Sequence, residues 1–308
     1  MNGKVLVVTP VYSTKENGRL PLLKQAISCV QNQTYSDFVH LIVDDGSTDE
    51  TPKFLDELSE KDKRINVFHK PNGGSSSAIN YGVEKAFSGG NYQYITITHS
   101  DDLLPRKSLE LRVNQMEGDK SKFLYSDSVI FNDFLRRYSL QLARNFPNAE
   151  ALFLGLKNLR IPYSTMFWNF RFFVDKVGGY DSRMKSLEDW DIAIRSAKKV
   201  LESNAKFSVV SKITSAYRIH EKNLAFENIS NGIRWECCKL IYEKYSDNFV
   251  NYSKSLLKGR IKLFAKKNLP PEVILHLKNF RSFLLKLPKE ELIPFEGNFI
   301  DLIHSGNF

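Results

Sequence analysis

The feature that most constrains this 308-residue chain is an alternation of two hydrophobic patterns in its first third. Short apolar runs rich in β-branched residues predict strands at Val5–Val8, Val39–Val43, Ile65–Phe68 and Tyr94–Thr98. Apolar residues at helical spacing predict the intervening helices Leu20–Val30, Thr51–Leu58 and Ala78–Phe87. Because strands that alternate with helices form right-handed crossovers, the sequence predicts an α/β fold with a mostly parallel sheet.

The same alternation predicts where a ligand would bind. In open α/β sheets, ligands bind beyond the carboxyl ends of the strands. Polar or acidic segments follow three of the predicted strands, at Thr9–Tyr12, Asp44–Ser47 and His99–Asp102. We expect these segments to meet along one edge of the sheet.

Two of these segments contain adjacent carboxylates. Asp101 and Asp102 could bind Mg²⁺ or Mn²⁺, because hard cations are often held by one or two carboxylates plus substrate phosphates. The alternative is a helix cap, but the position after a strand favours the metal site. Asp44 and Asp45 could accept a hydrogen bond from a base or a sugar, or could form an Asx turn before the next helix.

A glycine-containing loop, Asn72–Ala78, enters the third predicted helix. Backbone amides at such a position favour phosphate, although the segment could equally be a plain connection. It lacks the Gly-Lys-Ser ending of a P-loop and the spacing of a dinucleotide fingerprint.

The second half of the chain is less regular. We predict strands at Phe123–Tyr125, Phe207–Val210 and Ser215–Arg218, and a helix that begins near Glu188 and ends near Val200. The aromatic run Phe167–Phe173 is more typical of a core than of a binding surface.

Three polar side chains of this half are candidates for chemistry. Glu188 and Asp189 could supply a general base, or could simply be favourable acids at a helix N-terminus. His220 is a candidate ligand for a metal or a diphosphate, and its alternative is a structural role.

The net charge of +9 is concentrated near the end of the chain, where residues 251–290 hold ten Lys or Arg against two Glu. Between residues 253 and 287, basic and apolar residues interleave at helical spacing, a pattern that suits either packing helices or an anionic membrane surface. No recognition motif points to nucleic acid. The three cysteines lack metal-ligand spacing, and no apolar run is long enough to span a membrane, so we expect a cytoplasmic protein. Its basic segment would bring it to the membrane surface peripherally.

Taken in order, these segments resemble the motifs of the family 2 glycosyltransferases, which have the GT-A fold. The resemblance runs from about Lys4 to Leu224 and rests on six segments, namely Val7–Tyr12, Val43–Asp49, Asn72–Gly74 with Ala78 and Asn80, Ser100–Asp102, Gly178–Asp181 with Glu188–Asp191, and Tyr217–His220. Three positions depart from the family pattern. His99 stands where an Asp is usual, and Ile79 stands where an Arg often precedes the asparagine of the third motif. Ala225 stands where a Ser often follows the late His.

The resemblance implies a role for each candidate residue. It implies that the donor is bound by Thr9, Pro10, Tyr12, Asp44, Asp45, Asn72, Gly73, Asn80, His99, Ser100 and Asp101. It implies that Mn²⁺ or Mg²⁺ is held by Asp101, Asp102 and His220. Asp189, with Glu188 as the second candidate, would be the base of an inverting displacement.

The predicted protein is therefore a GT-A enzyme with a Rossmann-like central sheet flanked by helices. Residues 1–226 would form the catalytic domain, divided into a nucleotide-binding half (1–104) and an acceptor-side half (105–226), and residues 227–308 a helical extension. The expected reaction is hexosyl transfer from a nucleotide-diphosphate sugar, UDP-sugar favoured, to a carbohydrate or lipid-linked glycan. It would serve bacterial polysaccharide, lipid-linked oligosaccharide or glycoprotein glycan synthesis. The alternatives are a catalytically impaired nucleotide-sugar-binding domain and a nucleotidyltransferase.

Overall fold

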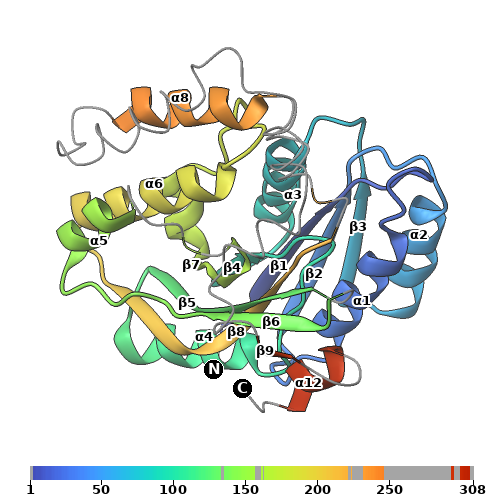
Figure 1. The fold of residues 1–308 in the computed structure, drawn as a ribbon, viewed down its shortest axis with the longest axis horizontal. Coiled ribbons are helices and arrows are strands. Elements are labelled where there is room, and N and C mark those ends of the chain that lie inside the picture. Colours follow the sequence, from blue (N-terminus) through green and yellow to red (C-terminus); the bar gives the residue numbers. More distant parts are fainter. Residues whose placement is uncertain are drawn as a thin grey trace.

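One mixed β-sheet with helices on both faces forms the body of the molecule (Figure 1). The computed structural model describes residues 3–132, 135–156, 161, 163–220, 223, 232–245, 293–294 and 299–305. Within them the strand order is β3-β2-β1-β4-β7-β5-β6-β9, and β8 pairs with β5 outside this path.

The first four strands form an entirely parallel half-sheet. They are β1 (Val5–Val11), β2 (Phe38–Asp44), β3 (Ile65–His69) and β4 (Tyr94–Ile97). All residues of β1 and β2 are buried, as expected for strands that carry helices on both faces. The connecting helices are α1 (Leu20–Gln31), α2 (Thr51–Lys61) and α3 (Ser75–Gly89). The prediction of four strands and three helices is thus confirmed.

The second half of the sheet mixes parallel and antiparallel pairs. β7 (Phe167–Asn169) runs antiparallel between β4 and β5 (Phe123–Asn132), and β6 (Arg137–Gln141) joins β5 to β9 (Ile293–Pro294) through antiparallel pairs. β8 (Phe207–Arg218) pairs parallel to β5 with two register shifts near Asp127. The two strands predicted in this region are therefore one strand. The prediction was wrong because the irregularity interrupts the apolar pattern without ending the pairing.

Helices cover the two faces of the sheet. α3, α5 (Ala149–Leu156) and α6 (Glu188–Glu202) share one hydrophobic cluster with the sheet, and α1, α2 and α4 (Ser108–Asp119) pack on the other side. The aromatic run is divided between the two faces, with Trp168 and Phe173 in the first cluster and Phe167 in a cluster on the other side, and all three are fully buried. The expectation that this run is core is confirmed. A 3₁₀ turn, Tyr163–Thr165, and a π-helix, Phe172–Val177, flank β7.

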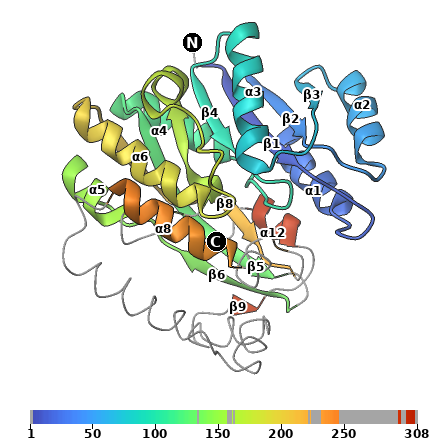
Figure 2. The ribbon, with the colours of Figure 1, turned by 90° about the horizontal axis from the view of Figure 1, so that it is seen from above.

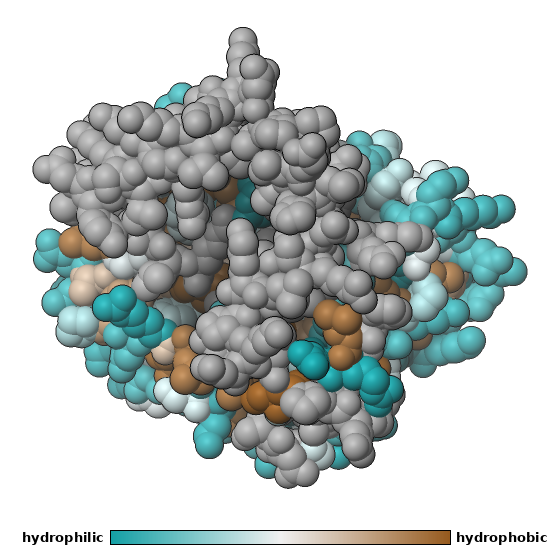
Figure 3. All heavy atoms as spheres, in the orientation of Figure 1, coloured by the Kyte–Doolittle hydropathy of each residue, from teal (hydrophilic) through white to brown (hydrophobic). Residues whose placement is uncertain are grey.

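Helix α8 (Ile233–Tyr245) lies beside α5 and α6 in both ribbon views, and α12 (Phe299–Ser305) packs against β5 through a stacked pair of Phe299 and Phe131 (Figures 1 and 2). The described surface over α2 is mostly hydrophilic (Figure 3). No helix among the described residues is long and apolar enough to cross a membrane. Most of the predicted helical extension, including residues 253–287, lies outside the described residues.

Candidate active site

The carboxyl ends of β1, β2 and β4 lie at one edge of the sheet. Val11 pairs with Asp44, and Val8 pairs with Ile97, in parallel register. Backbone hydrogen bonds continue this alignment beyond the strands, since the Asp45 amide donates to the Val11 carbonyl at 2.8 Å. The three polar segments that follow these strands therefore meet along one edge, as the sequence predicted.

The adjacent carboxylates Asp44 and Asp45 differ in what they hold. Asp44 Oδ1 accepts a hydrogen bond from the Ser47 amide at 3.0 Å, and Asp44 Oδ2 lies 2.8 Å from His69 Nδ1. Each oxygen has one such contact, and a carboxylate offers about four acceptor positions. Asp44 thus retains acceptor capacity for a ligand.

Asp45 instead organises the glycine loop before α3. Its Oδ1 accepts from Lys70 Nζ at 2.6 Å and from the Gly73 amide at 3.0 Å, and its Oδ2 accepts from the Gly74 amide at 2.7 Å. Gly74 has φ +88°, and Gly46 has φ +82° with the Asn72 amide only 2.9 Å from the position of a Cβ. These positive φ angles and close approaches favour glycine. Asp45 therefore fixes the loop that the resemblance places against the donor.

The same loop and helix contact the Gly178–Asp181 turn of the acceptor-side half. Asn80 Nδ2 donates to the Tyr180 carbonyl at 2.7 Å, and the Tyr180 amide donates to Asn80 Oδ1 at 2.8 Å. Ser76 Oγ also donates to the Met184 carbonyl at 3.3 Å. The Asn80 side chain therefore joins the predicted nucleotide-binding half to the predicted acceptor-side half.

Two residues of the nucleotide motifs face the core. Thr9 Oγ1 lies 2.8 Å from His40 Nε2, and both side chains are buried inside the sheet layer. Ile79 is fully buried in the cluster between α3 and the sheet. Tyr12, in contrast, is 42% exposed. Of the first motif, the Tyr12 side chain is therefore available to a ligand and the Thr9 side chain is not.

Asp101 is the focus of the acidic motif. Its Oδ2 lies 3.2 Å from Arg19 Nη1 and 3.1 Å from His220 Nε2, so residues from three distant parts of the chain meet there. Burial alone would raise the pKa of Asp101. The His220 hydrogen bond and the Arg19 charge outweigh burial, and they hold that pKa below its ordinary value.

Asp102 points to a different environment from Asp101. Its Oδ2 accepts a hydrogen bond from Ser164 Oγ at 2.7 Å, and its Oδ1 accepts from the Arg218 amide at 3.2 Å. Burial, and then the charge of Asp101, raise the pKa of Asp102 above its ordinary value. The Asp102 carboxyl thus ties the acidic loop to the 3₁₀ turn and to β8.

The acidic loop and the start of α6 share one electrostatic environment. Burial lowers the pKa of His99, while the carboxylates of Asp101 and Asp189 oppose that shift. Burial raises the pKa of Tyr217, and the charges of Asp102, Asp101 and Asp189 raise it further. The charge of Asp189 therefore reaches the same two side chains as the charges of the acidic loop.

The first turn of α6 carries the two predicted catalytic acids, Glu188 and Asp189. Leu187, which precedes the helix, has φ +62°. Asp189 is partly exposed, and its Oδ1 accepts a hydrogen bond from the following amide of Trp190 at 2.8 Å. Glu188 is also partly exposed. Both predicted catalytic carboxylates are therefore accessible from solvent.

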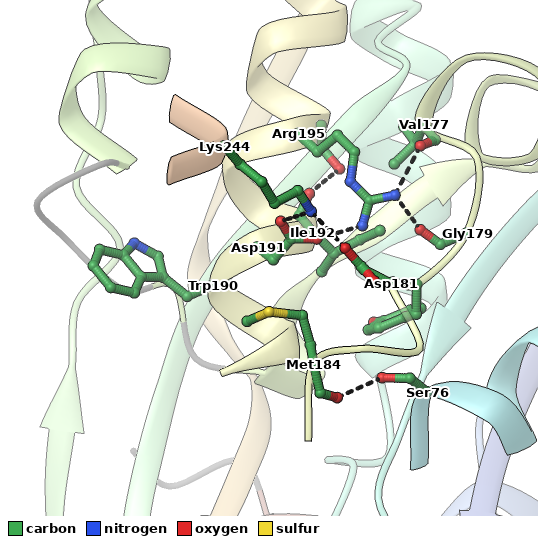
Figure 4. A network of polar contacts seen from close by, with 12 residues as sticks. Ser76, Val177, Gly179, Asp181, Met184, Trp190, Asp191, Ile192, Arg195 and Lys244 are labelled. Carbon is green, nitrogen blue, oxygen red and sulfur yellow. Dashed lines mark hydrogen bonds and ion pairs between the residues drawn. The ribbon is translucent and has the colours of Figure 1, made fainter. Parts of the chain in front are cut away.

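Asp191 is buried in a polar network that joins α6 to α8 (Figure 4). It accepts from Arg195 Nη2 at 2.5 Å, Lys244 Nζ at 2.5 Å and Tyr245 Oη at 2.8 Å. Lys244 also reaches Asp181 Oδ2 at 3.0 Å, so one ammonium group bridges the acceptor-side turn and the helix. This network anchors the segment that carries Asp189.

The residues present fit a divalent ion in part. Asp101 and His220 contact each other and supply an oxygen and a nitrogen, whereas Asp102 is turned into its own hydrogen bonds. Within the described residues, no group of three or more His, Cys, Asp or Glu side chains forms a complete metal cage. Two protein ligands completed by substrate phosphate and water are a common arrangement for such ions.

Three contributors to this site were not predicted from the sequence. Arg19 begins α1 far from the acidic motif, Ser164 lies in the irregular middle region, and His69 ends β3 one residue beyond the predicted strand. A basic residue in the loop after the first strand is a signal that could have indicated Arg19. Nothing in the local sequence distinguishes Ser164 from a loop serine.

The sheet order and the acidic edge of the sheet are those of the GT-A glycosyltransferase folds. Solved structures support this class. S. aureus TarS 1–349 in complex with UDP-GlcNAc matches with a TM-score of 0.58 and 18% identity over 94% of this chain and 77% of that chain. The mannosyltransferase PcManGT from Pyrobaculum calidifontis, in complex with GDP-Man and Mn²⁺, matches with a TM-score of 0.52 and 14% identity over 93% and 88%. The predicted GT-A fold is confirmed.

The family model described as glycosyl transferase family 2 matches residues 6–178, and the chain belongs to that family. An uncharacterised glycosyltransferase of Rickettsia bellii is 38% identical over 125 residues, which are 41% of this chain and 16% of the relative. Glycosyltransferase GlyG of Streptococcus pneumoniae is 33% identical over 38% of this chain and 36% of its own length. The match to these relatives thus spans well under half of their length.

Proposed function

We propose that the protein transfers a sugar from a nucleotide-diphosphate donor to an acceptor hydroxyl by an inverting displacement. The observation that carries this proposal is the shared environment of these acids, since the charges of Asp101, Asp102 and Asp189 all raise the pKa of the buried Tyr217 hydroxyl. An inverting transfer needs one group that stabilises the leaving diphosphate and a separate base for the acceptor.

On the donor side, we propose that Asp44, Tyr12 and Asn72 bind the nucleobase, and that Asp45 orders the glycine loop. Asp44 retains acceptor capacity, Tyr12 and Asn72 are exposed, and Asp45 is occupied by the loop amides. The resemblance and the UDP-GlcNAc and GDP-Man named with the two structural neighbours support a nucleotide-sugar donor, and we favour a UDP-sugar.

At the reaction centre, we assign Asp101 and His220 to Mn²⁺ or Mg²⁺. The bound ion would neutralise the charge that develops on the leaving diphosphate. Arg19, which already faces Asp101, adds a second positive charge beside it. Asp102 positions the loop through Ser164 and the Arg218 amide, and this differs from its expected role as a ligand.

On the acceptor side, we assign to Asp189 the removal of the hydroxyl proton as the oxygen attacks the anomeric carbon. Its partial exposure and its place near the acidic loop support this role. Glu188 remains the second candidate. The buried and triply bonded carboxylate of Asp191 is not suited to it.

We further propose that the acceptor is a carbohydrate or a lipid-linked glycan in a bacterial polysaccharide, oligosaccharide or glycoprotein pathway. A peripheral approach to anionic membranes would use residues 253–287, which lie outside the described residues. The basic and apolar pattern of that segment supports this part of the proposal.

A donor screen tests the proposed function. UDP-, dTDP-, GDP- and CDP-sugars are added with Mn²⁺ or Mg²⁺, and thermal shift is followed by turnover with glycan acceptors. We expect stabilisation by one nucleotide class and release of the nucleotide diphosphate upon transfer. Binding without turnover for every acceptor would favour the impaired binding domain. Release of pyrophosphate from a nucleoside triphosphate and a sugar phosphate would favour the nucleotidyltransferase.

A further inference from the structure

A histidine at the end of β3 contacts two carboxylates at once. His69 Nδ1 lies 2.8 Å from Asp44 Oδ2, and His69 Nε2 lies 3.0 Å from Asp56 Oδ1. Asp44 belongs to β2 and is 3% exposed at its side chain, whereas Asp56 belongs to α2 and is 65% exposed. The imidazole therefore bridges a buried acid of the candidate donor site to a solvent-facing acid on the outer helix.

The geometry favours the protonated form of His69. An ionised carboxylate only accepts hydrogen bonds, so both ring nitrogens must donate, and only the imidazolium carries two N–H groups. Burial lowers the pKa of His69, but the hydrogen bonds that the ring donates to Asp44 and Asp56 outweigh it and raise that pKa above its ordinary value. Asp44 and Asp56 are the charged groups that face the ring from the two elements packed against β3. The neighbouring Lys70 is directed to Asp45 instead.

We infer that His69 is a positioning residue for donor recognition, which as an imidazolium holds the Asp44 carboxylate in a fixed orientation so that it accepts the N–H of the donor's nucleobase. This inference rests on the proposed function, because it assigns a ligand to the acceptor capacity that Asp44 retains. The Ser47 amide fixes one carboxylate oxygen and His69 fixes the other. A carboxylate held on both oxygens presents its remaining lone pairs in one direction, which is the requirement for selective recognition of a planar base.

The inference predicts a particular pH dependence of donor binding. The His69 positive charge is present below its raised pKa and is lost as the pH rises through it. Without that charge, Asp44 loses a charged hydrogen bond and its fixed orientation. We expect UDP affinity to fall by about 3- to 10-fold across this transition, the worth of roughly one hydrogen bond.

The experiment measures UDP binding by calorimetry, with Mn²⁺ present, from pH 6 to pH 9 (roughly the range in which a histidine with a raised pKa titrates). The terminal phosphate of UDP itself titrates near about pH 6. The profile is therefore expressed as the ratio of wild type to His69→Gln, in which the phosphate contribution cancels. We expect the ratio to decline with pH, because glutamine keeps one hydrogen bond to Asp44 but carries no titrating charge.

A matched pair of variants separates positioning from a purely structural role. Asp56→Asn removes the outer carboxylate and should move the midpoint of the wild-type profile to lower pH. Glu57→Gln makes the same change of charge at the neighbouring exposed position of α2 and should leave the midpoint in place. Thermal melts check that each variant is folded.

Three results would overturn the inference. A pH profile shared by wild type and His69→Gln shows that the imidazolium has no part in binding. Equal midpoints for Asp56→Asn and Glu57→Gln show that the bridge does not set the titration. If wild type binds neither UDP nor any other nucleoside diphosphate at any pH, the proposed function fails with it, and that failure is seen before any variant is compared.

Discussion

Asp189 and Asp191 lie two residues apart in the first turn of α6. The same Asp→Asn substitution should lower the reaction rate at one position and the stability at the other. Asp189 is partly exposed and accepts a hydrogen bond from the neighbouring Trp190 amide, whereas the Asp191 side chain is 1% exposed. We predict that Asp189→Asn preserves stability and reduces kcat, and that Asp191→Asn reduces stability first. The pair serves as its own control, because both changes remove one charge from one helical turn.

The loss of stability expected for Asp191→Asn follows from the partners of the Asp191 carboxylate. The carboxylate accepts from Arg195 at 2.5 Å, Lys244 at 2.5 Å and Tyr245 at 2.8 Å. Breaking a buried ion pair typically costs about 3–5 kcal/mol. The lower end applies here, because Lys244 keeps Asp181 as a partner and Arg195 keeps the carbonyls of Val177 and Gly179. A loss of about 3 kcal/mol lowers the melting temperature by about 6–12 °C in a domain of this size.

The magnitude for Asp189 follows from its proposed chemistry. A positioned general base contributes about 10²–10⁴-fold to the rate, so Asp189→Asn should lose that factor in kcat while UDP affinity and melting temperature stay near wild type. Thermal melts, calorimetry with UDP and steady-state rates measure the three quantities. If Asp191→Asn melts like wild type but loses kcat while Asp189→Asn stays active, the assignment of base and anchor is reversed and the reasoning fails.

Two further predictions concern the metal and the membrane. EDTA should abolish turnover, and Asp101→Asn should weaken Mn²⁺-dependent UDP binding by at least about tenfold, since even outer-shell partners of a metal are worth that much; full activity in EDTA would contradict the metal assignment. The intact protein should sediment with anionic liposomes at low salt and be released at high salt, and removal of residues 251–308 should abolish this binding. Failure to bind anionic vesicles at low salt would show that residues 253–287 serve packing.

The parallel half of the fold could be predicted because its signals are local. Each strand there is a short apolar run and each helix has its own period, so the pattern alone predicts the elements and a parallel sheet. The second half depends on distant pairing. β7 lies between β4 and β5, and β8 runs beside β5 with register shifts, which no local pattern records. Burial of polar strand residues such as Ser126 and Ser128 further weakens the apolar pattern there.

The location of the candidate site could be predicted from the sequence, but the separate roles of its adjacent acids could not. The rule that ligands bind at the carboxyl edge identified Asp44, Asp45, Asp101 and Asp102 together. It could not assign different roles to neighbours. Asp45 is saturated by loop amides while Asp44 is not, and Asp101 faces Arg19 and His220 while Asp102 faces Ser164. These differences come from residues far away in the sequence.

Acids occur next to each other in the sequence of this site because the two members of a pair have different roles. Successive residues of an extended segment point to opposite sides, so one acid of an adjacent pair can hold the loop in place while its neighbour faces the ligand. Asp189 and Asp191 are two residues apart on helix α6 and also lie on different faces, because residues i and i+2 of a helix do not face each other. Asp45 binds the glycine loop, Asp102 binds the 3₁₀ turn and β8, and Asp191 binds α8. Each of these buried acids fixes the backbone beside another acid of the site. A rigid backbone reduces the reorganisation needed when charge develops during reaction, so loss of an anchoring acid should impair the reaction through its neighbour.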